Sequence, residues 1–142
     1  MEAQQLHRGR LIDHLQLVVR DLDASRRFYE AVCQALEIPL GGSDEGYFWV
    51  DELFVSSADS QAAQGQLTGR HHLAFQARDE AMVQAFHRAA LGAGGTDNGA
   101  PGLRPYHPGY YGAFVIDPDG NNIEAVYHGP AKRSAGSVEI TF

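Results

Sequence analysis

The sequence has little of what several large classes of protein depend on. Its single cysteine, Cys33, excludes a disulfide within the chain, so we expect a reducing compartment, the cytoplasm. Its 11 basic residues are outnumbered by 18 acidic ones and are scattered, whereas nucleic-acid binding requires a basic stripe. No apolar run is long enough to span a bilayer, and neither a secretion signal nor a polybasic anchor is expected. We therefore expect neither a nucleic-acid nor a membrane partner.

What the sequence does contain fits one folded domain. The chain has 142 residues, of which 44% are hydrophobic, enough to fill the core of a domain of this size. It also has seven histidines, more than structural roles usually require in so short a chain. These histidines are the first candidates for functional residues.

An internal repeat organises the chain. Aligned with itself at an offset of 58 residues, the chain has the same residue in both copies at seven of the 22 positions from His14 to Ala35. Each copy begins with the alternating pattern of a half-buried strand, opened by His14 in the first copy and by His72 in the second. A helix-capping aspartate follows, Asp21 or Asp79, and then apolar residues at helical spacing.

Short strand-like stretches follow each predicted helix, so each half is predicted to be a strand, a helix and two or three antiparallel strands. These later strands are predicted at residues 47–50 and 53–55 in the first half and at 111–116 and 122–127 in the second. Asp117–Gly120 is a strong turn signal between the last two. Ser56–Gly69 is predicted to connect the halves, and Val138–Phe142 gives a weak strand signal after a mobile tail.

Three candidate metal ligands lie on comparable strand faces. In the last predicted strand, Glu124 is the polar exception within an apolar run. Considered alone, Glu124 is better interpreted as a solvated residue on the open face of a sheet, and His14 as a hydrogen-bonded histidine in a sheet. Because the repeat relates the strands of His14 and His72, both imidazoles can project into a common groove with Glu124. Two imidazoles and a carboxylate suit a divalent metal with open coordination positions, with Zn, Mn, Fe, Ni and Co all left open.

The stretches IDHLQLVVRDLDASRRFY, HHLAFQARD and YYGAFVIDPDGNNIEAV resemble the vicinal oxygen chelate superfamily. This group includes glyoxalase I, fosfomycin-resistance transferases, methylmalonyl-CoA epimerase, extradiol dioxygenases and bleomycin-resistance proteins. The resemblance implies an α+β fold in which two pseudo-symmetric βαβββ modules form a cup-shaped curved sheet around a metal. The family's ligands match His14, His72 and Glu124. The loop GLRPYHPGYYG resembles an uncharacterised glyoxalase-like branch, which supplies no substrate.

The resemblance also implies boundaries and an oligomeric state. Residues 11–129 are expected to form one domain, with modules at about 11–57 and 70–129, an N-terminal arm at 1–10 and a C-terminal tail at 130–142. Members often dimerise, so we expect a homodimer. His14 is then expected to meet His72 and Glu124 of its own chain or of its partner.

A fourth ligand found in many members is not expected here. It lies on the last strand of the first module, where this sequence reads Leu53-Phe54-Val55. Glu52 is close by. To bring it to the ligand position, we expect that the strand register would have to shift by an odd number of residues, which would turn its side chain to the other face of the sheet. A three-ligand site resembles the fosfomycin-type transferases more than glyoxalase I.

The loop before the penultimate strand supplies candidate rim residues. Loops on a rigid sheet often carry specificity. Arg104 is a candidate for binding a carboxylate or phosphate, Tyr111 for contacting substrate, and Tyr106 and His107 for moving protons. A packing role for the tyrosines and a solvated Arg104 are equally open.

Three further residues are candidates for the cup itself. Gln16 and Gln76 share a face with the two histidines, so they are candidates for orienting ligands or substrate. Trp49 is a candidate for lining the cup, with core packing at least as good an explanation.

The leading functional hypothesis is a metal-dependent enzyme. It would bind a small substrate through two neighbouring oxygens and act as a lyase or isomerase by proton transfer through an enediolate. Glu124, Tyr106 and His107 are the candidates for the catalytic base. The alternatives are a fosfomycin-type thiol transferase, a small dioxygenase, and a non-catalytic binding protein of the bleomycin-resistance type.

Overall fold

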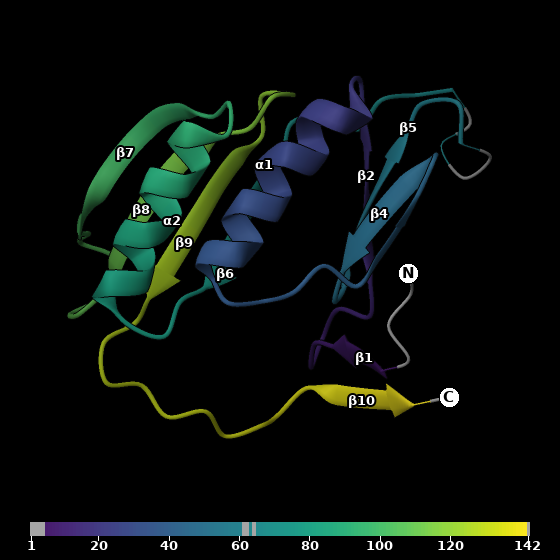
Figure 1. The fold of residues 1–142 in the computed structure, drawn as a ribbon. Helices are drawn as coiled ribbons and strands as arrows, with labels where there is room; N and C mark the ends of the chain where they lie inside the picture. The colour runs from purple at the N-terminus through teal and green to yellow at the C-terminus, as the bar shows by residue number, and fades with distance from the viewer. Residues whose placement is uncertain (1–4, 61–62, 64, 142) are drawn as a thin grey trace. The chain divides into compact units, whose positions relative to one another are not determined.

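The computed structural model describes residues 5–60, 63 and 65–141, which contain ten strands and two helices (Figure 1). In chain order the elements are β1 (Gln5–Arg8), β2 (Leu15–Val19), α1 (Leu22–Ala35), β3 (Gly42–Asp44), β4 (Tyr47–Val50), β5 (Leu53–Ser57), β6 (His72–Gln76), α2 (Glu80–Gly92), β7 (Thr96–Leu103), β8 (Tyr111–Ile116), β9 (Asn122–Tyr127) and β10 (Val138–Thr141). The order strand, helix and three strands occurs twice, from β2 to β5 and from β6 to β9. The predicted α+β fold of two βαβββ modules is therefore confirmed.

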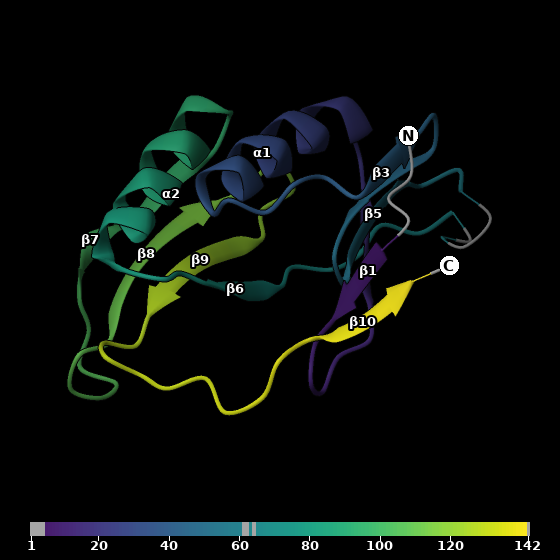
Figure 2. The same cartoon turned by 60° about the horizontal axis from the view of Figure 1, so that its bottom comes forward.

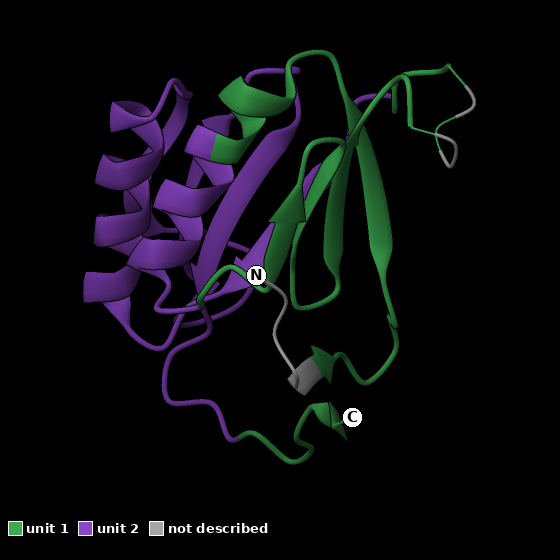
Figure 3. Ribbon diagram, turned by 45° about the vertical axis from the view of Figure 1, so that its right-hand side comes forward, with its two compact units in different colours: residues 1–26, 39–68, 133–142 green, residues 27–38, 69–132 purple. Residues whose placement is uncertain are grey.

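The chain divides into two compact units (Figure 3). Unit 1 comprises residues 1–26, 39–68 and 133–142, and unit 2 comprises residues 27–38 and 69–132. The boundary crosses α1, so the first turn of this helix belongs to unit 1 and the remainder to unit 2.

Unit 1 is built on a four-stranded sheet of order β2-β5-β4-β3. β2 and β5 run parallel and the other pairs are antiparallel. The predicted alternation in the first strand is confirmed, since Leu17 and Val19 are buried. Gln16 lies opposite Phe54 in the register between β2 and β5.

The two ends of the described chain form a second, two-stranded sheet in unit 1. Gln5 lies opposite Thr141 and Arg8 opposite Val138 in the antiparallel pair of β1 and β10 (Figure 2). The weak strand signal at Val138–Phe142 is confirmed as far as Thr141, and Phe142 lies outside the described residues. The strand β1 was not predicted from the sequence.

Unit 2 repeats the arrangement of the first sheet with the order β6-β9-β8-β7. β6 and β9 run parallel, and β8 is antiparallel to both β9 and β7. One face of this sheet is covered by α2, whose apolar side packs on it through Met82, Val83, Phe86 and Ala90 (Figure 1). The opposite face carries the candidate functional residues.

Helix α2 begins and ends where its sequence predicts. The carboxylate of Asp79 accepts a hydrogen bond from the backbone N–H of Met82, 2.8 Å away, which satisfies one of the free amides at the helix start. At the other end Gly94 has φ +98°, a conformation that favours glycine. A Cβ on Gly95 would lie 2.4 Å from Val115 and 2.8 Å from Phe28, so only glycine fits there.

The predicted turn between β8 and β9 is organised by Asp117, which is 4% exposed. Its Oδ1 accepts from the backbone N–H groups of Asp119 and Asn121. Its Oδ2 accepts from the Asn121 side-chain amide at 2.8 Å and from the Tyr29 hydroxyl at 2.5 Å. Four donors therefore compensate one buried carboxylate and fix the start of β9.

The structure changes one predicted boundary. The connecting segment was predicted to start at Ser56, but Ser56 and Ser57 belong to β5 and pair with Val18 and Val19. Pairing with β2 therefore extends β5 beyond its apolar residues to Ser57. Among the described residues, no helix is long and apolar enough to cross a membrane.

Candidate metal and substrate site

A buried carboxylate and an imidazole meet on the face of the unit 2 sheet away from α2. The parallel register of β6 and β9 places His72 opposite Asn122 and Ala74 opposite Glu124. His72 Nε2 lies 3.0 Å from Glu124 Oε1. Glu124 is 1% exposed, whereas the side chain of His72 is half exposed. The pair thus joins the interior to the surface.

The second oxygen of Glu124 is held by Tyr110, whose hydroxyl donates to Oε2. Burial, this hydrogen bond and the negative charge of Glu124 raise the pKa of Tyr110 to about 12, against a lowering effect of Arg104. The phenol therefore remains a donor at neutral pH. Gly112 leaves room for the contact, because a Cβ there would lie 3.0 Å from Glu124 Oε2 and 3.3 Å from Tyr110 Cε1.

The hydrogen bond of the other ring nitrogen, His72 Nδ1, indicates what lies between His72 Nε2 and Glu124 Oε1. Nδ1 is 3.1 Å from the backbone carbonyl oxygen of Asn122, which can only accept, so Nδ1 carries a proton. A neutral imidazole has only one N–H group. His72 Nε2 and Glu124 Oε1 would then be two acceptors facing each other, so a proton or a metal cation must lie between them. With a proton between them the two atoms form an ordinary hydrogen bond. The same imidazole nitrogen and carboxylate oxygen are donors that would hold a divalent metal.

His14, the third predicted ligand, is oriented in the same way within unit 1. Its Nδ1 is 2.7 Å from Asp13 Oδ1, and this hydrogen bond lowers the pKa of Asp13, with help from the charges of Arg8 and His14. The ring meets that of Phe54 edge to face at 5.6 Å. Nδ1–H held by an oxygen leaves Nε2 available to a metal, the arrangement usual for metal-binding histidines.

The structure brings two of the three predicted ligands together. His72 and Glu124 are paired in unit 2, while His14 belongs to unit 1. In the part of the chain that the structure describes, no three His, Cys, Asp or Glu side chains form a group that could hold a metal ion.

The register explains why the first sheet supplies no carboxylate. Gln16 and Ala74 are equivalent in the repeat, and their partners across the parallel strands are Phe54 and Glu124. Phenylalanine therefore stands in the first sheet where the second has its carboxylate. Glu52 lies two residues before Phe54, the position equivalent to Glu124. Bringing Glu52 to that position would need a register shift of two residues, so the prediction of an odd shift was wrong. Glu52 lies in the turn before β5, where burial raises the pKa of its carboxyl group.

The predicted rim residues form an aromatic cluster around Tyr110. The ring centroids of Tyr106, His107 and His128 lie 4.9, 5.3 and 5.3 Å from that of Tyr110. His107 Nε2 is also 2.8 Å from His128 Nδ1. Tyr106 and His107 are exposed, and their described contacts are with this cluster rather than with the carboxylate of Glu124.

The remaining predicted substrate residues lie in different places. Tyr111 lies opposite Tyr127 on the helix-covered face, where its hydroxyl accepts from Gln84 of α2 at 3.0 Å, so it does not share a face with Glu124. Gln76 is exposed on β6, on the same side as His72.

The other two predicted substrate residues belong to unit 1. Gln16 donates to the Ser56 hydroxyl at 2.8 Å. Trp49 is 4% exposed and stacks on Phe54, which favours the packing role.

Sequence reasoning did not assign Tyr110 and Asp13 as partners of the ligands. Asp13 precedes His14 directly, so adjacency was a usable signal. Tyr110 lies two residues before Gly112, which faces Glu124, so strand alternation would place both on the same side of the sheet. Tyr110 precedes β8, however, and alternation does not predict the direction of a loop side chain.

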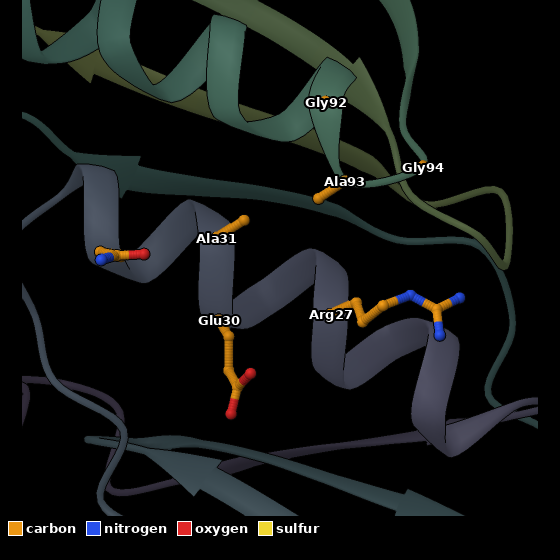
Figure 4. Close-up of a pocket in the computed structure, with 7 residues that line it drawn as sticks. Arg27, Glu30, Ala31, Gly92, Ala93 and Gly94 are labelled. Atoms are coloured by element: carbon orange, nitrogen blue, oxygen red, sulfur yellow. The ribbon is translucent and has the colours of Figure 1, made fainter.

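A separate pocket of about 460 Å³ lies on the helix side of unit 2, between α1 and the end of α2 (Figure 4). It is lined by Arg27, Glu30, Ala31, Gln34, Gly92, Ala93 and Gly94. None of these is a predicted site residue, and the set contains neither histidine nor cysteine.

Comparison with known proteins identifies the family. Residues 11–125 match the model of the glyoxalase/bleomycin resistance protein/dioxygenase superfamily, so the chain belongs to this superfamily. Its members generally act on small molecules and typically bind a divalent metal. No curated protein matches the sequence.

Solved structures extend the comparison. A glyoxalase/bleomycin resistance protein from Albidiferax ferrireducens T118 is 29% identical, with a TM-score of 0.67 over 82% of this chain and 97% of that one. A family enzyme from Burkholderia phytofirmans PsJN is 20% identical, with a TM-score of 0.64 over 82% and 97% of the two chains. Lactoylglutathione lyase from Agrobacterium tumefaciens is 18% identical, with a TM-score of 0.59 over 83% and 93%. The last two comparisons show the fold alone.

Proposed function

We propose that this protein is a divalent-metal-dependent enzyme that acts as a lyase or isomerase on a small substrate with two neighbouring oxygens. The observation that carries the proposal is the facing of His72 Nε2 and Glu124 Oε1 at 3.0 Å, with Nδ1 and Oε2 engaged elsewhere. Either a proton or a metal cation is needed between these two atoms, and we propose that it is the metal. His14, from the same chain or from a second copy in a dimer, is the proposed third ligand.

When bound, the metal supplies a Lewis acid that makes the C–H bond next to a substrate carbonyl more acidic. Glu124 would accept that proton on Oε2, the oxygen not assigned to the metal, and return it to the neighbouring carbon. Tyr110 holds one oxygen of this carboxylate, which limits its rotation. Tyr106 and His107, the other candidate bases, contact the ring of Tyr110 instead.

Metal content tests the first part of the proposal. We expect about one divalent metal per chain in untagged protein purified without chelators, and its loss in His72→Ala and Glu124→Gln. His71→Ala is the matched control, because it removes the preceding histidine and should retain the metal. Circular dichroism would confirm that each variant is folded. A wild-type protein that takes up no metal on titration would instead support a bleomycin-resistance-type binding protein.

Hydrogen exchange tests the second part. The metal-loaded protein would be incubated in D2O with hydroxyacetone and related α-hydroxycarbonyl compounds, and proton NMR would follow the C–H groups beside the carbonyl. We expect metal-loaded wild type to accelerate exchange. We expect no acceleration by metal-free wild type or by Glu124→Gln, which should also lose the metal. Stoichiometric metal without exchange in any of these compounds would favour thiol transfer or dioxygen chemistry over proton transfer.

A further inference from the structure

Arg104 carries a positive charge that no described carboxylate neutralises. Its Nη2 donates to the carbonyl oxygen of Ala100 at 2.6 Å and its Nη1 to that of Leu103 at 3.3 Å. Its guanidinium carbon lies 5.4 Å from the centre of the Phe114 ring. These contacts fix the guanidinium but leave part of its five-donor fork unused. They also leave its charge uncompensated in a chain of net charge −7.

The backbone around Arg104 is shaped to admit the guanidinium. The pairing of β7 with β8 shifts register on both sides of Gly99, and such bulges redirect side chains beside functional sites. A Cβ on Gly99 would lie 2.9 Å from Phe114 Cδ2 and 3.3 Å from Arg104 Nη2. A Cβ on Gly102 would lie 3.1 Å from Nη1. The backbone N–H of Arg104 donates to the carbonyl of Tyr110 at 2.9 Å, which ties it to the Glu124 site.

Phe114 connects this charge with the proposed metal ligands. It lies directly opposite Glu124 on β9 and Gly99 on β7, so all three positions share one sheet face. The His72 ring stacks on Phe114 with centroids 6.0 Å apart. His72 and Arg104 therefore contact the same phenylalanine ring.

We propose that Arg104 forms an anion subsite and that the substrate carries a carboxylate or phosphate group. This inference rests on the proposed function, because the other end of the substrate is the pair of oxygens bound at the metal. The spacer between the two ends is short and lies along the Phe114 ring. The charge-assisted hydrogen bonds from Arg104 then select anionic substrates over neutral ones with the same chelating group.

Three hydroxamates test the subsite against the metal-loaded protein by isothermal titration calorimetry. Acetohydroxamate supplies the two neighbouring oxygens alone. Succinic acid monohydroxamate adds a remote carboxylate, and phosphonoacetohydroxamate adds a phosphonate, so the two anionic arms distinguish carboxylate from phosphate recognition. We expect at least one anionic probe to bind wild type about 10- to 100-fold more tightly than acetohydroxamate.

Arg104→Gln should remove this advantage while acetohydroxamate binds as in wild type, which also reports an intact metal site. Arg104→Lys keeps the charge and should retain part of the advantage. Equal binding of all three probes by wild type would overturn the subsite and leave the proposed function standing, as would an advantage that survives in Arg104→Gln. Failure of every probe to bind would overturn both.

Discussion

Replacing Tyr110 with phenylalanine removes the hydroxyl group that donates to Glu124 Oε2 and leaves the ring in place. Glu124 is only 1% exposed, so water cannot readily take over the lost hydrogen bond. A hydrogen bond to a charged group contributes about 1.5–3 kcal/mol, and we expect Tyr110→Phe to lower the free energy of unfolding by about this amount.

The same change should weaken metal binding. Residues that orient a ligand typically contribute about 10- to 100-fold to metal affinity. One factor of ten corresponds to about 1.4 kcal/mol, so this range agrees with the energy of the lost hydrogen bond. Competition with a chromogenic chelator at pH 7 would measure the affinity, and urea denaturation the stability.

Tyr106→Phe is the matched control for this experiment. Tyr106 contacts the same cluster but is 67% exposed, so loss of its hydroxyl should change the metal affinity less than threefold, about 0.7 kcal/mol. If Tyr110→Phe bound one metal per chain with wild-type affinity, the reasoning that Tyr110 positions Glu124 would be refuted. Equal losses in the two variants would refute it as well.

Three further predictions concern stability. Asp79→Ala removes the acceptor for the Met82 amide at the start of α2, and urea denaturation should show a loss of about 1 kcal/mol. Tyr29→Phe leaves the buried carboxylate of Asp117 with one donor fewer, so the same assay should show a loss of about 1.5–3 kcal/mol. Because the folded-state pKa of Tyr110 is raised from 10.0 to about 12, its contribution to stability is complete below pH 10 and is lost as the pH rises through 12. Alkaline unfolding followed by circular dichroism should therefore be shallower over this range in Tyr110→Phe.

The repeat made most of the fold predictable. Alternation at Leu15–Val19 and a capping aspartate before each helix gave the order of elements, because both signals are local. β3 and β7 were not individually predicted, since Gly42–Asp44 and Thr96–Leu103 are rich in turn-forming residues. Their strand geometry comes from pairing with β4 and β8, which no local pattern encodes.

The candidate site was predictable in part. Glu124 stood out as a carboxylate in an apolar strand, and the repeat singled out His72. The role of Tyr110 depended on how a proline- and glycine-containing loop folds back over β9, which is a tertiary property. The prediction chose Tyr111 as the substrate contact, but Tyr111 lies on the helix-covered face of the sheet, and its neighbour Tyr110 contacts Glu124.

The pairing of β1 with β10 has a consequence for folding kinetics. Gln5 and Thr141 come from opposite ends of the chain, so closing this pair involves a larger loop-closure entropy than pairing strands within either module. The short pair has few ladder hydrogen bonds to set against that cost. It should therefore form after the two four-stranded sheets and open before them. Its backbone amides would then exchange with solvent through local opening, while those of β8 and β9 exchange only when unit 2 unfolds.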